Sequence, residues 1–189
     1  MNTNQKTKKI GKKKKLSELM AKGEGLSGFV WPENCGDFDM RIAEDGTWYY
    51  RNSPIGRKNL VKLFATVLQR DADGQYWLVT PVERGLVQVD DVPFVIVEME
   101  VRSGEGGQEL HMRTSLDHWI RLDKDHELFI RKAPNADEDR PYVHIRDGLE
   151  ALINRAVYYD LVEMAEFQQN TLSVQSAGSS FILGVLEDA

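Results

Sequence analysis

A stretch of nine residues, RPYVHIRDG (Arg140–Gly148), gathers side chains that could bind an anion. If the stretch is a β-strand, successive side chains point to opposite faces. One face then belongs to the core and carries Pro141, Val143 and Ile145. The other face carries Arg140, Tyr142, His144 and Arg146. Guanidinium groups bind phosphate through paired hydrogen bonds and aromatic rings can stack on a base, so this second face suits a nucleotide-like anion.

Further basic and aromatic residues lie near two predicted helix starts. Arg57 follows the first start and Arg155 lies on the second helix, with Tyr158 nearby. Unpaired N–H groups at a helix start also favour an anion. We therefore predict a cationic, aromatic cleft between two packed units. The predicted ligand-binding residues are Arg57, Arg113, Arg140, Tyr142, His144, Arg146, Arg155 and Tyr158.

Each of these residues also has a structural interpretation. Arg140 directly follows three acidic residues and could pair with them. Arg113, Arg146 and Arg155 could be ion-pair partners that hold the fold together. Their acidic candidates are Glu83, Glu98 and Glu150. Only the concentration of several such residues in one short motif favours ligand binding.

Other kinds of chemistry find little support in the residue spacing. His111, Asp117, His118 and His126 are close in the sequence, but no HxH, HExxH or CxxC spacing links them, so we expect no metal. SAGSS (Ser176–Ser180) lacks the context of a nucleophile elbow, and GEGG (Gly104–Gly107) has no following Lys-Ser/Thr. We predict no catalytic residue and no cofactor, and hence a protein that is not an enzyme.

The charge of the chain is divided unevenly along its length. The formal net charge is −6, yet residues 1–22 hold eight of the 24 Lys and Arg residues and one acid, which leaves the remainder at −13. Such a lysine run can contact nucleic acid or an anionic surface, but it lacks interleaved aromatics. We expect residues 1–25 to be a disordered solubilising tail without nucleic-acid contact. The single cysteine, Cys35, and the lack of a membrane-length apolar run predict a cytoplasmic protein without a membrane partner.

The predicted elements form two similar α+β units, residues 26–92 and 93–189. In the first, a hairpin over Phe38–Tyr50 precedes a helix that begins at Ser53 with Pro54 in its first turn, and Gln75–Glu83 follows as a strand. In the second, a strand from Leu128, a turn and the RPYVHI strand precede a helix that begins at an Asp147–Glu150 capping box. The order strand, strand, helix, strand thus occurs twice, about 90 residues apart, which indicates an internal duplication.

Four segments together resemble the bacterial domain-of-unknown-function family DUF1285. They are SPIGR, LVTPVE, PFVIVEME and RPYVHIRDGLEALINRAVYYDLVE, the last of which is long and distinctive. The resemblance extends from about Gly28 to Ile182. It implies a duplicated core with a C-terminal part like a pleckstrin-homology fold, a nucleotide-like ligand at the domain interface, and a role in signalling. The lysine-rich start is not part of this resemblance.

Three functional hypotheses follow. The first is a non-catalytic sensor that binds a small anionic, nucleotide-like ligand between its two units. The second is a protein-interaction adaptor that uses an exposed sheet edge or helix face. The third is an enzyme that acts on a phosphorylated compound with His144 as acid or base; no second catalytic group lies at a suitable spacing, so we rank it last.

Overall fold

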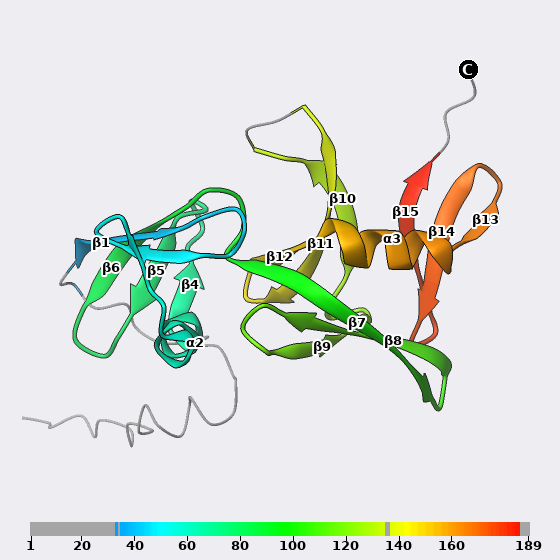
Figure 1. The fold of residues 1–189 in the computed structure, drawn as a ribbon, viewed down its shortest axis with the longest axis horizontal. Coiled ribbons are helices and arrows are strands. Elements are labelled where there is room, and N and C mark those ends of the chain that lie inside the picture. The colour runs from blue at the N-terminus through cyan, green and yellow to red at the C-terminus, as the bar shows by residue number, and fades with distance from the viewer. Residues whose placement is uncertain (1–32, 34, 135–136, 186–189) are drawn as a thin grey trace, which may run out of the picture.

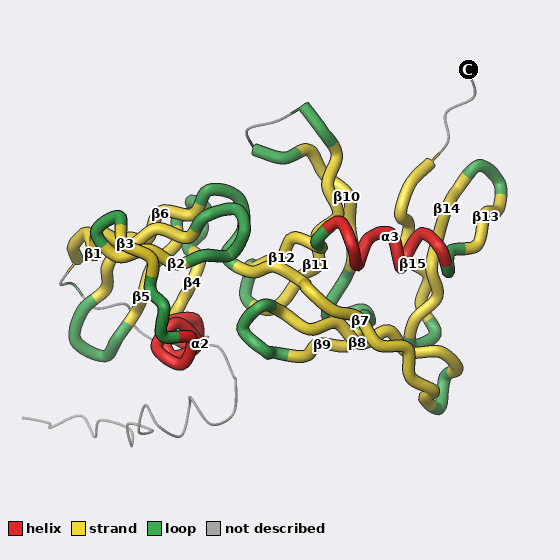
Figure 2. Tube along the Cα trace, viewed as in Figure 1, coloured by secondary structure: helices red, strands yellow, loops and turns green. Residues whose placement is uncertain are grey.

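A computed structural model describes residues 33, 35–134 and 137–185. The predicted lysine-rich tail therefore lies outside the described residues. The described chain is mostly β-structure with two helices, arranged as two units side by side (Figures 1 and 2). One continuous cluster of buried apolar side chains runs through both units, so they pack against each other directly.

The N-terminal unit is one six-stranded sheet with a helix beside it. Its elements are β1 (Cys35–Ile42), β2 (Trp48–Tyr50), β3 (Ser53–Pro54), α2 (Lys58–Thr66), β4 (Leu68–Arg70), β5 (Tyr76–Val79) and β6 (Arg84–Val89). The strand order is β3-β2-β1-β6-β5-β4, with β1 and β6 parallel and the other pairs antiparallel. Because β6 returns to the middle of the sheet, the elements before and after the helix share one sheet.

The C-terminal unit contains two sheets. Its elements are β7 (Phe94–Gly104), β8 (Gly107–Thr114), β9 (Trp119–Arg121), β10 (Leu128–Lys132), β11 (Asp139–Arg146), β12 (Leu149–Ile153), α3 (Arg155–Glu163), β13 (Glu166–Gln168), β14 (Thr171–Ser176) and β15 (Ser179–Val185). A six-stranded sheet has the order β10-β11-β12-β7-β8-β9, and a three-stranded sheet has the order β13-β14-β15. The elements after the helix therefore form a sheet of their own.

Both helices begin later than predicted. Ser53 and Pro54 belong to strand β3. Asp147 and Gly148 form a hairpin turn, and Leu149 and Glu150 already belong to β12. Asp147 and Gly148 both have positive φ values, 47° and 74°, which is the backbone of a type I′ turn. An Asp-Gly pair between two apolar runs favours that turn, so the capping-box interpretation was wrong.

The element order recurs in a longer form than predicted. The three strands directly before each helix and the three after it give the order β-β-β-α-β-β-β in both units, which corrects the predicted β-β-α-β unit. In the C-terminal unit β7, β8 and β9 come before this order. The predicted hairpin before α2 and the RPYVHI strand are confirmed as β1-β2 and β11.

Candidate functional site

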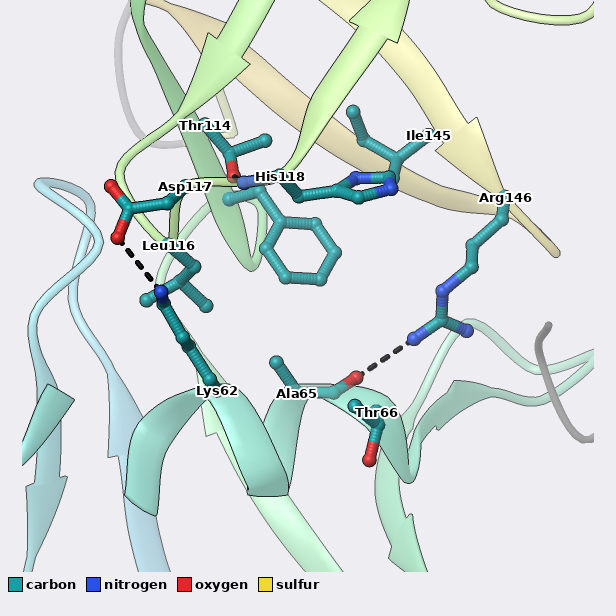
Figure 3. Close-up of a pocket in the computed structure, with 10 residues that line it drawn as sticks. Lys62, Ala65, Thr66, Thr114, Leu116, Asp117, His118, Ile145 and Arg146 are labelled. Atoms are coloured by element: carbon teal, nitrogen blue, oxygen red, sulfur yellow. Dashed lines mark hydrogen bonds and ion pairs between the residues drawn. The ribbon is translucent and has the colours of Figure 1, made fainter. Parts of the chain in front are cut away.

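A cavity of about 290 Å³ lies between the two units (Figure 3). The N-terminal unit contributes helix α2, and the C-terminal unit contributes β7, β8, the β8–β9 turn and β11. The lining residues are Lys62, Ala65, Thr66, Phe94, Thr114, Leu116, Asp117, His118, Ile145 and Arg146. The cavity is at the lower end of the size range of small-molecule sites, about 300–1,000 Å³.

One end of the cavity is closed by ion pairs between the units. Lys58 and Lys62 are four residues apart, so both project from the same face of α2. Their ammonium groups lie 2.7 and 2.8 Å from the Asp117 carboxylate, and the Arg113 guanidinium lies 2.9 Å from it. The hydrogen bonds from Lys58, and then Lys62, hold the pKa of Asp117 far below its usual value. This carboxylate is therefore an interface anchor.

Arg146 reaches across the opposite end of the cavity. It is the last residue of β11, and its Nη2 donates to the carbonyl oxygen of Ala65 in α2 at 2.7 Å. Only 20% of its side-chain surface is exposed, and burial lowers the pKa of the guanidinium, an effect that the nearby Asp147 opposes. A guanidinium has five N–H donors, so the bond to Ala65 leaves donors for a ligand.

His118 lines the cavity on the same C-terminal unit as Arg146, with its ring beside Ile145 (Figure 3). Its backbone N–H donates to Thr114 Oγ1 at 3.1 Å, which holds the residue in the turn just before β9. Burial, followed by the positive charge of Arg146, lowers the pKa of its imidazole, so the ring is neutral at pH 7. Within the described part of the chain, neither ring nitrogen has a hydrogen-bond partner. A neutral imidazole can therefore offer a ligand one donor and one acceptor.

The structure separates Arg146 from most of the other predicted site residues. Tyr142 is fully buried, where its ring stacks on Phe129 and its hydroxyl donates to Asp91 at 2.7 Å. Arg140 pairs with Glu138 and, across the unit boundary, with Glu44. In the structure, both residues hold the fold together and neither lines the cavity.

The remaining predicted residues lie elsewhere. His144 Nδ1 lies 3.2 Å from the backbone carbonyl oxygen of Asp125, and its Nε2 accepts a hydrogen bond from the backbone N–H of Gly148 at 3.3 Å. The Arg155 guanidinium contacts Tyr159 on the exposed side of α3, and the Tyr158 hydroxyl donates to Leu183 in β15. Arg57 is exposed at the start of α2, beside a separate hollow within the N-terminal unit, and Arg113 supports Asp117 from outside the cavity. The structure does not gather these residues into one cleft.

Sequence reasoning missed two features of the cavity. The Lys58/Lys62 spacing was a readable signal for two cations on one helix face. His118 and Asp117 were considered only as metal ligands. No pattern in the sequence placed them beside helix α2 of the other unit, where Lys58 lies 59 positions before Asp117. That juxtaposition needs the packing of the units.

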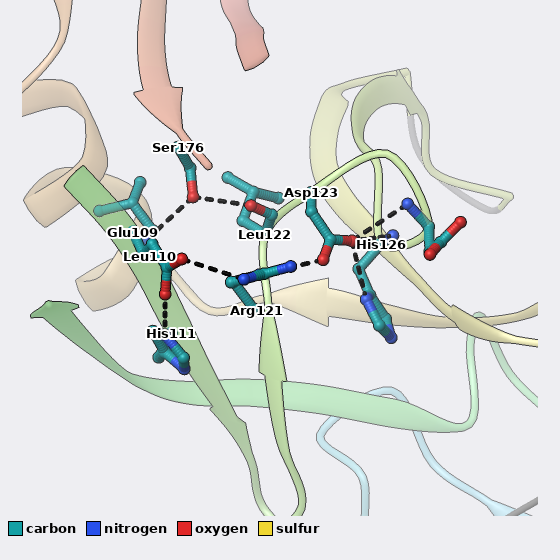
Figure 4. A network of polar contacts seen from close by, with 9 residues as sticks. Glu109, Leu110, His111, Arg121, Leu122, Asp123, His126 and Ser176 are labelled. Atoms are coloured by element: carbon teal, nitrogen blue, oxygen red, sulfur yellow. Dashed lines mark hydrogen bonds and ion pairs between the residues drawn. The ribbon is translucent and has the colours of Figure 1, made fainter. Parts of the chain in front are cut away.

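The other histidines take part in a polar network on the C-terminal unit (Figure 4). His111 lies 3.1 Å from Glu109, His126 lies 3.1 Å from Asp123, and Arg121 joins the two acids. Within the described ranges no group of three or more His, Cys, Asp or Glu residues could hold a metal ion. The buried Ser176 accepts from the N–H of Leu110 and donates to the carbonyl of Leu122, so it ties β14 to the large sheet.

Comparisons with known proteins agree on one family. The model of the DUF1285 N-terminal domain, described as a domain of unknown function, matches residues 30–92, and that of the DUF1285 C-terminal domain, a protein of unknown function, matches residues 93–183. The chain belongs to the DUF1285 family. No curated protein shows significant similarity to it.

Two crystal structures of DUF1285 proteins resemble this chain. One, from Silicibacter pomeroyi DSS-3, is 36% identical with a TM-score of 0.76, and the match covers 89% of this chain and 95% of that one. The other, from Shewanella baltica OS155, is 29% identical with a TM-score of 0.52, and the match covers 66% of this chain and 90% of that one. None of the helices in the described part of this DUF1285 protein is long and apolar enough to span a membrane.

Proposed function

We propose that this DUF1285 protein is a non-catalytic sensor that binds a small anionic ligand in the cavity between its two units, with nucleotide-like compounds as one candidate class. The observation that carries the proposal is that Arg146 and His118 face the same inter-unit cavity. The guanidinium supplies charge and donors, and the imidazole supplies a polar group without a protein partner among the described residues. A cytoplasmic location belongs to the same proposal.

The position of the cavity favours a signalling role. Its walls come from both units, and the contacts that close it, Lys62 with Asp117 and Arg146 with Ala65, each join one unit to the other. A ligand that contacts both walls has a different affinity for each arrangement of the units, and that difference shifts the population between arrangements. Ligand occupancy could thus be passed to a partner as a change in the relative position of the units.

The cavity gives little support to catalysis. Asp117 is a carboxylate in the cavity lining and so a candidate general base. It pairs with two lysines, however, and its lowered pKa makes it a poor proton acceptor. His144, the acid or base of the enzyme hypothesis, does not line the cavity. We therefore propose binding without a chemical step.

A thermal-shift panel of nucleotides, cyclic dinucleotides and phosphorylated or carboxylated metabolites tests the proposal. We expect at least one class to raise the melting temperature of the wild type and to lose that effect in Arg146→Ala. His118→Gln tests the same cavity without removing the bond from Arg146 to Ala65. Arg155→Ala is the matched control, because this exposed arginine contacts Tyr159 on α3 and should leave the shift intact. A panel without any shift would contradict the proposal.

The second candidate function is a protein-interaction adaptor. It is favoured by exposed apolar side chains on the elements from α3 onward: Tyr159, Phe167, Ile182 and Val185 are each half exposed or more. The pleckstrin-homology-like character inferred for the C-terminal unit belongs to this proposal, since such folds can bind peptides at a sheet edge. A pull-down partner that is retained by Arg146→Ala but lost on Ile182→Ser would favour the adaptor.

A further inference from the structure

We propose that the ligand of the inter-unit cavity is a singly charged organic acid: a carboxylate with a compact apolar body, and not a phosphate ester. This inference rests on the proposed function and specifies the chemical class that the site takes. It follows from the charge balance, the lining and the size of the cavity.

The charge balance at the cavity leaves one positive charge to be matched. Four cationic side chains lie at or directly behind the walls: Lys58, Lys62, Arg113 and Arg146. Three carboxylates pair with them: Glu98, Asp117 and Asp147. His118 is neutral, because burial and Arg146 lower its pKa. A single negative charge restores neutrality in this half-buried site, whereas a phosphate monoester would bring close to two.

The available donors suit a carboxylate. Arg146 has N–H groups beyond the one given to Ala65, and a guanidinium and a carboxylate match each other as two parallel hydrogen bonds. Both lysines at the other end are already occupied by Asp117, at 2.7 and 2.8 Å. A phosphate is normally surrounded by several free cations or backbone N–H groups, and this cavity offers one guanidinium.

The rest of the lining calls for an apolar body. Phe94, Leu116, Ile145 and Ala65 supply most of the wall between the charged ends. At about 290 Å³ the cavity suits a single ring or a branched aliphatic chain and is small for a dinucleotide. The tyrosines that were expected to stack on a base are unsuitable, since Tyr142 is buried in the core and Tyr158 bonds Leu183.

His118 predicts a proton linkage for such a ligand. The charged and titratable groups near its ring are Arg146 on β11, Lys62 on α2, Asp117 in the preceding turn and His126 before β10. A carboxylate placed between Arg146 and His118 would be a second anionic partner for Arg146, besides Asp147 at 3.7 Å, and can pair with the protonated form of His118. The imidazole pKa then rises on binding, so binding takes up a proton and becomes tighter as the pH falls from 8 to 6.

Isothermal titration of the full-length chain with matched probes tests the inference. The probes are benzoate, its neutral isostere benzamide, the dianion phthalate and phenyl phosphate, with 4-methylpentanoate as an aliphatic acid. We expect the monocarboxylates to bind at least tenfold more tightly than benzamide, phthalate and phenyl phosphate. Arg146→Ala should weaken benzoate binding at least tenfold, His118→Gln should flatten its pH dependence, and Arg155→Ala should change neither. Arg146→Lys, which keeps the charge, covers the case in which Arg146→Ala does not fold.

The outcomes separate this inference from the proposed function. If phenyl phosphate or a nucleotide binds more tightly than every carboxylate and still requires Arg146, the ligand class is wrong and the anion site stands. If the carboxylates bind to Arg146→Ala and to Arg146→Lys as tightly as to the wild type, the assigned position of the carboxylate is wrong. If neither carboxylates nor phosphates bind, both proposals fail.

Discussion

The two helices of this protein occupy the same place in a repeated order of elements, yet only α2 borders the inter-unit cavity. Each helix lies between a run of three strands and three following strands, and in the C-terminal unit β7, β8 and β9 come before that run. The strands after α2 join the sheet formed by the strands before it, with β6 paired to β1. Helix α2 faces the other unit. After α3 the chain forms a separate three-stranded sheet, and Tyr158 and Leu161 of α3 are covered within the C-terminal unit. A repeated order of elements therefore does not repeat the site.

The helices also differ in how their ends are held. Asn154 caps α3 by accepting a hydrogen bond from the N–H of Val157 at 2.8 Å. Arg57, at the corresponding position of α2, makes no side-chain cap. What holds α2 in place lies in the other unit: Asp117 binds its first and second turns, and Arg146 binds its last turn. The helix at the cavity is stabilised across the interface, and the other helix is stabilised locally.

The largest effect is expected at a fully buried leucine of α3, compared with an exposed leucine of α2. Leu161 of α3 is fully buried, whereas Leu63 of α2 is 41% exposed. Leu161→Ala should reduce the free energy of unfolding by about 2–5 kcal/mol, because it removes buried methyl groups and leaves a cavity. Leu63→Ala is the matched control and should cost much less. Urea denaturation measures both; equal losses would show that the difference in burial between Leu161 and Leu63 does not set the cost.

A smaller difference is expected at the helix starts. Asn154→Ala should cost about 1 kcal/mol, because it removes an N-cap that satisfies an otherwise free N–H group. Arg57→Ala, which removes no cap, should leave the urea midpoint almost unchanged. If Arg57→Ala destabilised the protein as much as Asn154→Ala, the two helix starts would not differ in the way described.

The smallest effect is expected at Asp117, and it should depend on pH. The hydrogen bonds from Lys58 and Lys62 lower its folded pKa, so its contribution to stability is complete above the unfolded value of about 3.9 and is lost as the pH falls below it. The stability gap between the wild type and Asp117→Asn should therefore shrink between pH 6 and pH 3. The control is Asp160→Asn on α3, which changes an exposed carboxylate without an ion-pair partner within the described ranges. The difference in stability between the wild type and this variant should not change with pH in the same way.

Much of the fold could be predicted from local patterns. The alternation in RPYVHI correctly predicted strand β11, and the helix expected between the first hairpin and the following strand is present as α2, although it begins at Lys58. The helix starts were wrong because Ser-Pro and Asp-Gly each fit two local structures, a helix start or a strand and its turn. The choice between them depends on whether a neighbouring strand is available for pairing, and this is a tertiary property.

The candidate site shows the same division. The sequence by itself determined the α+β class, the recurrence of elements and the concentration of cations, since these follow from side-chain type and spacing. Only the tertiary structure decided which cation meets a cavity: Arg146 and His118 are 28 residues apart, and Ala65 is far from both in the sequence. The same strand face sends Tyr142 into the core and Arg146 to the interface, because β11 is covered by different neighbours along its length. Alternation assigns a side chain to a face, and packing decides what covers that face.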